Sequence, residues 1–170
     1  MKGEGYAIFL IPSSEVYSKL SGIISSLGKK YSTPIFEPHV TVLATIQGKE
    51  KEIIEKTSRF AGLLKPCTVR LTTVDYFDEY WRCLFIRVEK TKPVIHSMEK
   101  ASGIFGFRFY PEFLPHLSLM YGNFPKGTKE KIISEIGRAF NLAFEARSLH
   151  LVDCSGEPEE FRRVREFPIG

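Results

Sequence analysis

Two copies of one short motif hold the residues of this chain that are best suited to chemistry. Pro38-His39-Val40-Thr41 and Pro115-His116-Leu117-Ser118 share the order proline, histidine, apolar residue, hydroxyl residue. In a β-strand, side chains two residues apart point to the same face, and the residue between them points to the other face. Each copy on a strand would therefore present one imidazole beside one hydroxyl, with its apolar residues buried in a core.

Two imidazoles and two hydroxyls are sufficient for phosphoester chemistry without a metal ion. Opening a cyclic phosphate with water requires a base that takes the water proton and an acid that protonates the departing alkoxide. Imidazole has an unperturbed pKa of about 6.5, so a pair can hold opposite protonation states near neutral pH. We expect His39 and His116 to be this acid–base pair. Thr41 and Ser118 would donate hydrogen bonds to the non-bridging phosphate oxygens, where charge builds in the transition state.

Duplication is what favours catalysis over a structural role for these histidines. A single histidine on a strand is more often a surface or hydrogen-bonded structural residue than a catalyst. Here the spacing recurs, because Phe9 precedes His39 by 30 residues (39 minus 9) and Phe85 precedes His116 by 31 (116 minus 85). A chain built from two related units commonly places its site between them.

Hydrophobic periodicity predicts the elements that position the two motifs. We expect two units, roughly residues 5–80 and 82–168, each of the order strand–helix–strand–helix–strand and each containing a strand that ends in Val-Asp, at Asp75 and Asp153. The predicted fold class is α+β, with two pseudo-symmetric lobes that each combine an antiparallel-rich sheet with two helices. The site would lie in the cleft between the lobes. We treat the whole chain, 1–170, as a single bilobal phosphoesterase domain.

The individual elements follow from strand-like apolar runs and from apolar residues at helical spacing. Strands are predicted over residues 6–11, 38–46, 68–76, 81–88, 115–121, 149–153 and 161–167, and helices with apolar faces over 16–27, 53–64, 94–105 and 132–140. The turn between the third and fourth strands carries the aromatic residues Tyr76, Phe77, Tyr80 and Trp81. These either form an aromatic lip over the substrate or belong to an ordinary hairpin with one packed side.

The composition limits the classes of function. The 170 residues carry a net charge of +4 without a block of like charges, which excludes a surface that coats nucleic acid but suits a small anionic ligand. The three cysteines, Cys67, Cys83 and Cys154, form no CxxC pair, so we expect reduced thiols. We find no HExxH or paired CxxC zinc motif and no GxxxxGK phosphate loop, and we expect no metal and no cofactor.

The sequence shows no signal for a membrane. No apolar stretch approaches the ~20 residues of a membrane span, and residues 1–5 lack the apolar core of a secretory signal. We therefore expect no membrane partner, a cytoplasmic location and a monomer. The remaining histidines, His96 and His150, are predicted to have no part in the site.

The two motifs resemble those of a known family. His39-Val40-Thr41 and His116-Leu117-Ser118, whose histidines are 77 residues apart (116 minus 39), resemble the two-histidine phosphoesterase superfamily, with its two His-x-Thr/Ser motifs on pseudo-symmetric lobes. PHVTV together with PHLSLMY is most similar to the eukaryotic-type cyclic phosphodiesterases, and residues 6–12 and 81–84 also fit. The resemblance implies hydrolysis of ADP-ribose 1″,2″-cyclic phosphate and of nucleoside 2′,3′-cyclic phosphates to 2′-phosphates. It further implies a place in tRNA splicing and RNA metabolism.

The resemblance also implies roles for individual residues. It assigns His116 as base and His39 as acid for hydrolysis, and it adds Tyr121, five residues after His116, as a substrate-binding residue. Strict alternation places Tyr121 on the face opposite to His116, so the strand must end or twist before it. Phe9 occupies a position where similar enzymes carry an aromatic that stacks on a base, although phenylalanine there is equally a core residue.

Two alternatives keep the same site. One is an enzyme that processes RNA ends, as the 2′-5′ RNA ligase-like and exonuclease-like branches of the superfamily do, and such an enzyme favours a more basic groove. The other is a non-catalytic module that recognises a nucleotide or RNA. The presence of both histidines and both hydroxyls favours the enzyme.

Overall fold

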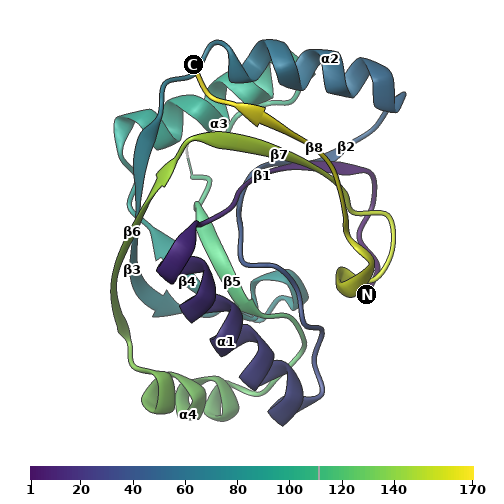
Figure 1. Cartoon of the computed structure of the whole chain (residues 1–170). Helices are drawn as coiled ribbons and strands as arrows, with labels where there is room; N and C mark the ends of the chain where they lie inside the picture. Colours follow the sequence, from purple (N-terminus) through teal and green to yellow (C-terminus); the bar gives the residue numbers. More distant parts are fainter. Residues whose placement is uncertain (111) are drawn as a thin grey trace.

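The computed structural model describes residues 1–110 and 112–170 (Figure 1). Its strands are β1 (Tyr6–Leu10), β2 (Val40–Ile46), β3 (Cys67–Asp75), β4 (Leu84–Val88), β5 (His116–Met120), β6 (Ala139–Ala146), β7 (Ser148–Asp153) and β8 (Arg162–Pro168). Its helices are α1 (Ser14–Tyr31), α2 (Glu50–Ala61), α3 (Lys92–Phe105) and α4 (Lys126–Ile136), with the 3-10 turns η1 (Tyr80–Arg82) and η2 (Pro158–Glu160).

The strands of the described residues form one curled sheet in which neighbouring strands run antiparallel. The order β6-β3-β4-β5-β2-β1-β7-β8 makes the two motif strands, β2 and β5, neighbours at its centre. Val40 of β2 pairs with Leu117 of β5 at this position. The sheet thus divides into two halves, β6-β3-β4-β5 and β2-β1-β7-β8, and the motifs lie where the halves meet.

Two helices accompany each half of the sheet. Helix α1 contacts β5 and β6, and an ion pair between Lys30 and Glu135 links α1 to α4. Helix α2 contacts β7 and β8, while α3 contacts β2 and α2. In Figure 1, α2 and α3 lie together at the top of the view, and α1 and α4 lie at the bottom. This arrangement confirms the predicted α+β fold of two lobes with two helices each. The sheets predicted for the lobes are the two halves of one antiparallel sheet.

The lobes do not coincide with the two sequence units. Strand β3 closes the first unit but pairs with β4 of the second, whereas β7 belongs to the second unit and pairs with β1 of the first. The first unit therefore contributes β3 to the other lobe, and the second unit contributes β7 and β8. The Val-Asp endings are also not equivalent, because Asp75 pairs with Phe85 whereas Asp153 pairs with Tyr6, three residues before Phe9 (9 minus 6).

One predicted helix was too long, and one strand was missed. Helix α4 ends at Ile136, where Gly137 adopts a φ of 89° and donates its N–H to the Ile133 carbonyl. A positive φ is readily adopted by glycine and ends a helix. Phe140, predicted on the helix, instead opens the alternating burial pattern of β6, in which Phe140, Phe144 and Ala146 are buried.

Two strand boundaries differ from the prediction by more than one residue. The strand predicted over 81–88 begins at Leu84, because residues 80–82 form the turn η1. The first motif strand begins at Val40 rather than at Pro38. Proline has no N–H to donate to a strand ladder, so it stands before the strand and not within it.

The central strands bury their two faces in different ways. The helix-covered face contributes Ile8, Leu10, Val40 and Leu117 to the main core, where each is at most 2% exposed. The other face has a smaller apolar cluster, made of Ala7, Phe9, Val152 and Cys154. The polar residues of the motifs therefore point to the less heavily packed face, as the alternation in sequence predicts.

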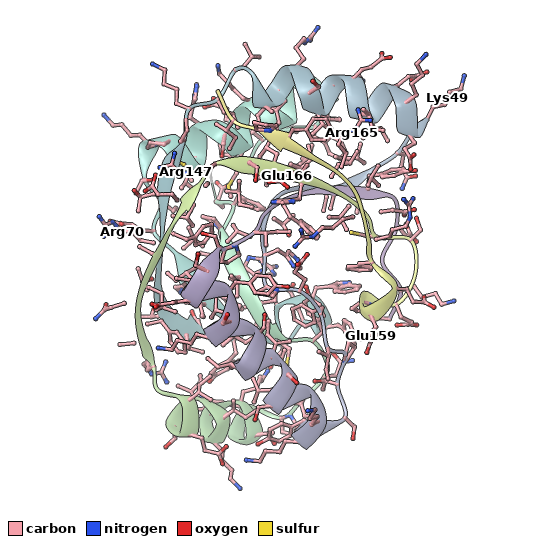
Figure 2. All side chains as sticks on the ribbon, viewed as in Figure 1. Lys49, Arg70, Arg147, Glu159, Arg165 and Glu166 are labelled. Atoms are coloured by element: carbon pink, nitrogen blue, oxygen red, sulfur yellow. The ribbon has the colours of Figure 1, made fainter. Side chains whose placement is uncertain are left out.

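Charged side chains cover the outside of the molecule. Lys49 and Arg70 point away from the ribbon in Figure 2. Among the described residues, no helix combines the length and the apolar character needed to cross a membrane.

Candidate active site

Both motifs line one pocket of about 540 Å³. His39 and Thr41 enter it from the β2 side, and His116 and Ser118 enter it from β5. Because Val40 and Leu117 are partners in an antiparallel pair, His39 lies opposite Ser118 and Thr41 lies opposite His116. Each imidazole thus has a hydroxyl of its own strand and one of the other strand as neighbours. The structure brings together the four residues that we predicted to be catalytic.

The two imidazole rings are held by the same local bond. His39 Nδ1 lies 2.6 Å from the Glu37 carbonyl oxygen, and His116 Nδ1 lies 2.8 Å from the Leu114 carbonyl oxygen. A carbonyl oxygen can only accept, so Nδ1 carries the proton in both rings and Nε2 remains for proton transfer. In both motifs a proline separates the histidine from this acceptor, and its fixed φ restricts the turn that brings ring and carbonyl together.

A phenylalanine packs against each histidine. The Phe9 ring stacks on His39 with centroids 3.7 Å apart and an interplanar angle of 14°, and Phe85 meets His116 at 5.1 Å and 61°. The register is equivalent, because Phe9 pairs with Thr41 and Phe85 pairs with Ser118. Of the two roles left open for Phe9, the structure favours packing, since its side chain is 5% exposed and His39 stacks on its ring.

Burial sets the protonation of both rings in the free protein. The pKa of His39 is lowered to about 4, mainly by burial and to a smaller extent by His116, while the bond to the Glu37 carbonyl opposes the shift. Burial also lowers the pKa of His116, with a smaller contribution in the same direction from Arg82. Both imidazoles are therefore neutral at neutral pH, and a bound phosphate anion would raise both pKa values.

Tyr121 reaches the pocket because its strand ends one residue earlier, at Met120. Its ring stacks on Phe36 at 4.0 Å and 19° and meets Trp81 edge-on at 4.9 Å and 75°. Burial raises the pKa of Tyr121, and the nearby Ser118 hydroxyl, which donates to the Trp81 carbonyl at 3.2 Å, opposes this shift. Tyr121 thus remains a neutral phenol beside a motif hydroxyl, and the predicted end of the strand before Tyr121 is confirmed.

The predicted aromatic lip is present only in part. Trp81 lines the pocket, whereas the Tyr76 hydroxyl donates to Glu130 of α4 at 2.8 Å and the Phe77 ring packs against Phe85. Opposite Trp81 stands Phe161, just after η2, with ring centroids 6.5 Å apart and an interplanar angle of 25°. Sequence reasoning assigned Phe161 only to the last strand.

Charged residues also line the pocket without having been predicted. They are Lys2, Glu4 and Arg82. The Arg82 guanidinium binds Glu79 through three contacts of 2.7 to 2.9 Å, which fixes its charge at the rim. Nothing in their spacing marks them, because the lobes bring them to the site from the N-terminal segment and from η1. A larger hollow of about 960 Å³, lined in part by lysines and by His96, contains neither motif.

Within residues 1–110 and 112–170, no three His, Cys, Asp or Glu side chains are grouped so that they could hold a metal ion. Cys67, Cys83 and Cys154 are free thiols, with Cys83 and Cys154 buried. Of the other two histidines, His150 lies on β7, where its ring nitrogen Nε2 is 3.2 Å from the Ser148 hydroxyl.

Comparison with known proteins assigns the family. The model of a family described as cyclic phosphodiesterase-like proteins matches residues 4–167. The chain belongs to this family. The cyclic phosphodiesterase of Arabidopsis thaliana is 23% identical to it over 164 residues, covering 94% of this chain and 90% of the relative. Membership of the cyclic phosphodiesterase-like family makes the chain a phosphodiesterase.

Solved structures share the fold at low identity. TT0787 of Thermus thermophilus has a TM-score of 0.68 and 16% identity, with 97% of each chain covered. E. coli LigT, in its structure complexed with 3′-AMP, has a TM-score of 0.66 and 13% identity, with 99% of each chain covered. These neighbours and the cyclic phosphodiesterase-like family belong to the two-histidine phosphoesterase superfamily, as the motifs indicated.

Proposed function

We propose that this chain hydrolyses cyclic phosphates on small nucleotides without a metal ion. The substrates would be ADP-ribose 1″,2″-cyclic phosphate, nucleoside 2′,3′-cyclic phosphates, or both, and the latter would open to 2′-phosphates. One observation carries the proposal: His39 and His116 line one pocket from neighbouring strands, and both keep Nε2 free for proton transfer. The cyclic phosphodiesterase of Arabidopsis thaliana supports it by its name.

In this mechanism the phosphate lies between the two rings. One imidazole takes a proton from water as the water oxygen bonds to phosphorus, and the other gives its proton to O3′ as the bond from phosphorus to O3′ breaks. Thr41 and Ser118, which line the pocket, would donate to the non-bridging oxygens, where charge develops. For this the Ser118 hydroxyl must turn from the Trp81 carbonyl, to which it donates at 3.2 Å in the free protein. The bound phosphate anion raises the pKa of the rings, so the ring that acts as the acid takes up the proton it needs from solvent.

Two arguments about which histidine is the base and which is the acid lead to opposite assignments. Family resemblance makes His116 the base and His39 the acid. Burial favours the reverse, because His39 is 7% exposed and has a pKa of about 4, whereas His116 is less deeply buried. A 3′-sulfur analogue of the cyclic substrate decides between them, since its thiolate leaves without a proton. The alanine variant of the acid should regain turnover on this analogue, and the variant of the base should not.

The test of the function is turnover of 2′,3′-cyclic nucleotides and ADP-ribose 1″,2″-cyclic phosphate in excess chelator. His39→Ala and His116→Ala should each lose a factor of about 10²–10⁴ in kcat, the usual contribution of one proton transfer. His96→Ala is the matched control, because His96 lines the separate hollow and should leave turnover unchanged. Turnover near the wild-type level in either motif variant would overturn the proposal.

A second candidate function is supported by the loop before β5. Phe107, Tyr110 and Phe113 are 36–57% exposed, and Phe113 and Thr41 line both the active-site pocket and a neighbouring pocket along this loop. Exposed aromatics beside a cation, here Arg108 over the Tyr110 ring at 5.3 Å, suit stacking of single-stranded bases. An RNA end carrying a cyclic phosphate would then be the substrate. Strongly salt-dependent binding of oligonucleotides would favour this function over action on mononucleotides.

The remaining expectations stand as proposals. We propose a role in tRNA splicing and RNA metabolism, which the family resemblance supports, and also a cytoplasmic location and a monomer. The exchange of strands between the two sequence units supports a single bilobal domain over 1–170. Sedimentation of the purified chain tests the monomer, and limited proteolysis without separable halves tests the single domain.

A further inference from the structure

The carbonyls that hold the two histidines belong to very different residues. His39 donates to the carbonyl of Glu37, whose side chain is charged, and His116 donates to the carbonyl of Leu114, whose side chain is apolar. The local turn is otherwise the same in both motifs. The residue two positions before each histidine is thus one point at which the two sites diverge.

The Glu37 carboxylate is bound on both oxygens. Tyr17 donates its hydroxyl to Oε1 at 2.9 Å, and Arg163 donates Nε to Oε2 at 2.8 Å and a terminal nitrogen to Oε1. Burial raises the pKa of Glu37, but the hydrogen bonds from Arg163 and Tyr17 outweigh it and leave the pKa below its usual value. Glu37 is therefore ionised and held by a bidentate guanidinium, the stronger class of ion pair.

The two partners of Glu37 come from opposite halves of the molecule. Tyr17 lies on α1, which packs against β5 and β6, whereas Arg163 lies on β8 at the far edge of the other half. Behind the His39 ring is a second pocket of about 400 Å³, the rear pocket, which Tyr17, Glu37 and Arg163 line together with His39. Space on this side would let the ring and its peptide move if Glu37 were released.

We propose that Glu37 is a positioning residue for His39, fixed by Arg163 and Tyr17, and that this three-residue clamp orients His39 through the Glu37 carbonyl. The inference rests on the proposed function, in which His39 transfers a proton. It assigns no contact between the clamp and the phosphate. Its consequence is that His39 has a rigid support that spans both lobes, while His116 depends on its loop and on packing alone.

The clamp should act on kcat rather than on KM. A misplacement of about 1 Å at a reacting group can cost 10²-fold in rate, whereas substrate binding is unaffected by a residue that does not touch it. Glu37→Gln keeps the shape of the side chain but loses the ion pair. We expect it to lower kcat by about 10- to 100-fold with little change in KM.

The clamp should also affect the pKa of His39, because it places a carboxylate paired with a guanidinium beside this ring. Charge on Glu37 raises the pKa of His39, and Arg163 offsets that charge. Glu37→Gln should therefore lower the pKa of His39, and Arg163→Met, which leaves the carboxylate unopposed, should raise it. Both variants leave in place the other titratable groups that line the two pockets around His39, which are Lys2, Glu4, Tyr17, Arg82, His116, Tyr121, Cys154 and Glu159.

The chain offers a matched control one residue away on the same strand. Arg162 of β8 lies 3.3 Å from Glu50, and the Tyr6 hydroxyl donates to the same Glu50 oxygen at 3.2 Å. This cluster repeats the chemistry of the clamp, a tyrosine, a glutamate and an arginine, without a bond to either histidine. Glu50→Gln and Arg162→Met should leave kcat and the pKa of His39 at their wild-type values.

The experiment measures kcat and KM on a 2′,3′-cyclic nucleotide and the pKa of His39 by NMR for the four variants, with Tyr17→Phe as a milder fifth in case Arg163→Met does not fold. The proposal predicts the loss of kcat and opposite shifts of the pKa of His39 in the two clamp variants only. Equal shifts in clamp and control variants, or a kcat within twofold of wild type in Glu37→Gln, would overturn it. The NMR titration needs no turnover, so an inactive wild-type protein refutes the proposed function while the pKa shifts still decide the clamp.

Discussion

The two motif histidines have the same bond to a carbonyl two residues earlier, a phenylalanine at the same register and a hydroxyl two residues later, but they differ in support. His39 stacks face to face on Phe9 and lies deep in the fold, whereas His116 meets Phe85 at an angle and is less buried. The groups that would touch a phosphate are thus equivalent in the two halves. The surroundings that set orientation and pKa are not, which suits two rings that must take opposite roles in one reaction.

After the loss of an imidazole, the largest decrease in kcat should come from removing a motif hydroxyl. Thr41→Val and Ser118→Ala should each lower kcat by about 10²–10³-fold, the usual cost of removing one donor to a developing oxyanion. If the halves are equivalent at the phosphate, the two losses should be similar. Steady-state kinetics on one cyclic nucleotide compares them, and a loss confined to one variant would show that a single hydroxyl binds the phosphate.

The two phenylalanines should separate stability from activity. Phe85 is fully buried, so Phe85→Ala should destabilise the fold by about 3–5 kcal/mol, as large-to-small core substitutions do. Phe9 belongs to the smaller apolar cluster, so Phe9→Ala should destabilise the fold less. It removes the ring on which His39 stacks, however, and should lower kcat more than the loss of stability explains. Chemical denaturation and kinetics on both variants, at a temperature where each is folded, test this contrast.

Burial of His39 should also make stability depend on pH. The folded pKa of about 4 lies below the unfolded value, so the unfolded state binds more protons and stability falls as pH drops from about 6.5 to 4. A shift of this size corresponds to a loss on the order of 3 kcal/mol across that window. His39→Gln should lose correspondingly less stability than wild type between pH 7.5 and pH 4, measured by urea denaturation. Parallel pH profiles for the two proteins would contradict this assignment.

The smallest effect is expected at Tyr121. Its phenol is neutral and lies beside Ser118, so Tyr121→Phe removes one hydroxyl next to the proposed phosphate donor and keeps the stack on Phe36. A lost neutral hydrogen bond costs about 0.5–1.5 kcal/mol, or a few-fold in rate. Tyr121→Ala, which also removes the stack, should be clearly worse in both kcat and stability. Equal effects of Tyr121→Phe and Tyr121→Ala would contradict the separate contribution of the ring stack.

Local patterns were sufficient to predict the motif strands and the shared face of each histidine and hydroxyl. Residue alternation needs no knowledge of the fold, and the duplication predicted the meeting of the two motifs. Strand β6 was missed because the spacing of Ile132, Ile136 and Phe140 fits a helix as well, and only Gly137 marks the break. The exchange of β3 and β7 between lobes depends on long-range pairing, which periodicity cannot show.

The same limit explains which site residues were missed. Glu37 and Arg163 lie 126 residues apart, and no motif joins them. Phe161 and Arg82 enter the pocket from turns after β7 and β3 whose placement depends on the curl of the sheet. The position of Glu37 directly before the motif proline can be read from the sequence. Only the hydrogen bond from His39 to the Glu37 carbonyl in the structure shows why this position matters.

The most direct test is to titrate both imidazoles by NMR with and without a nucleoside 2′-monophosphate, the proposed product. If His39 and His116 converge on one phosphorus, the bound phosphate should raise the pKa of both rings together from their lowered values in the free protein. A rise at one ring alone, or at neither, would show that the two histidines do not share a phosphate and would contradict the proposed mechanism.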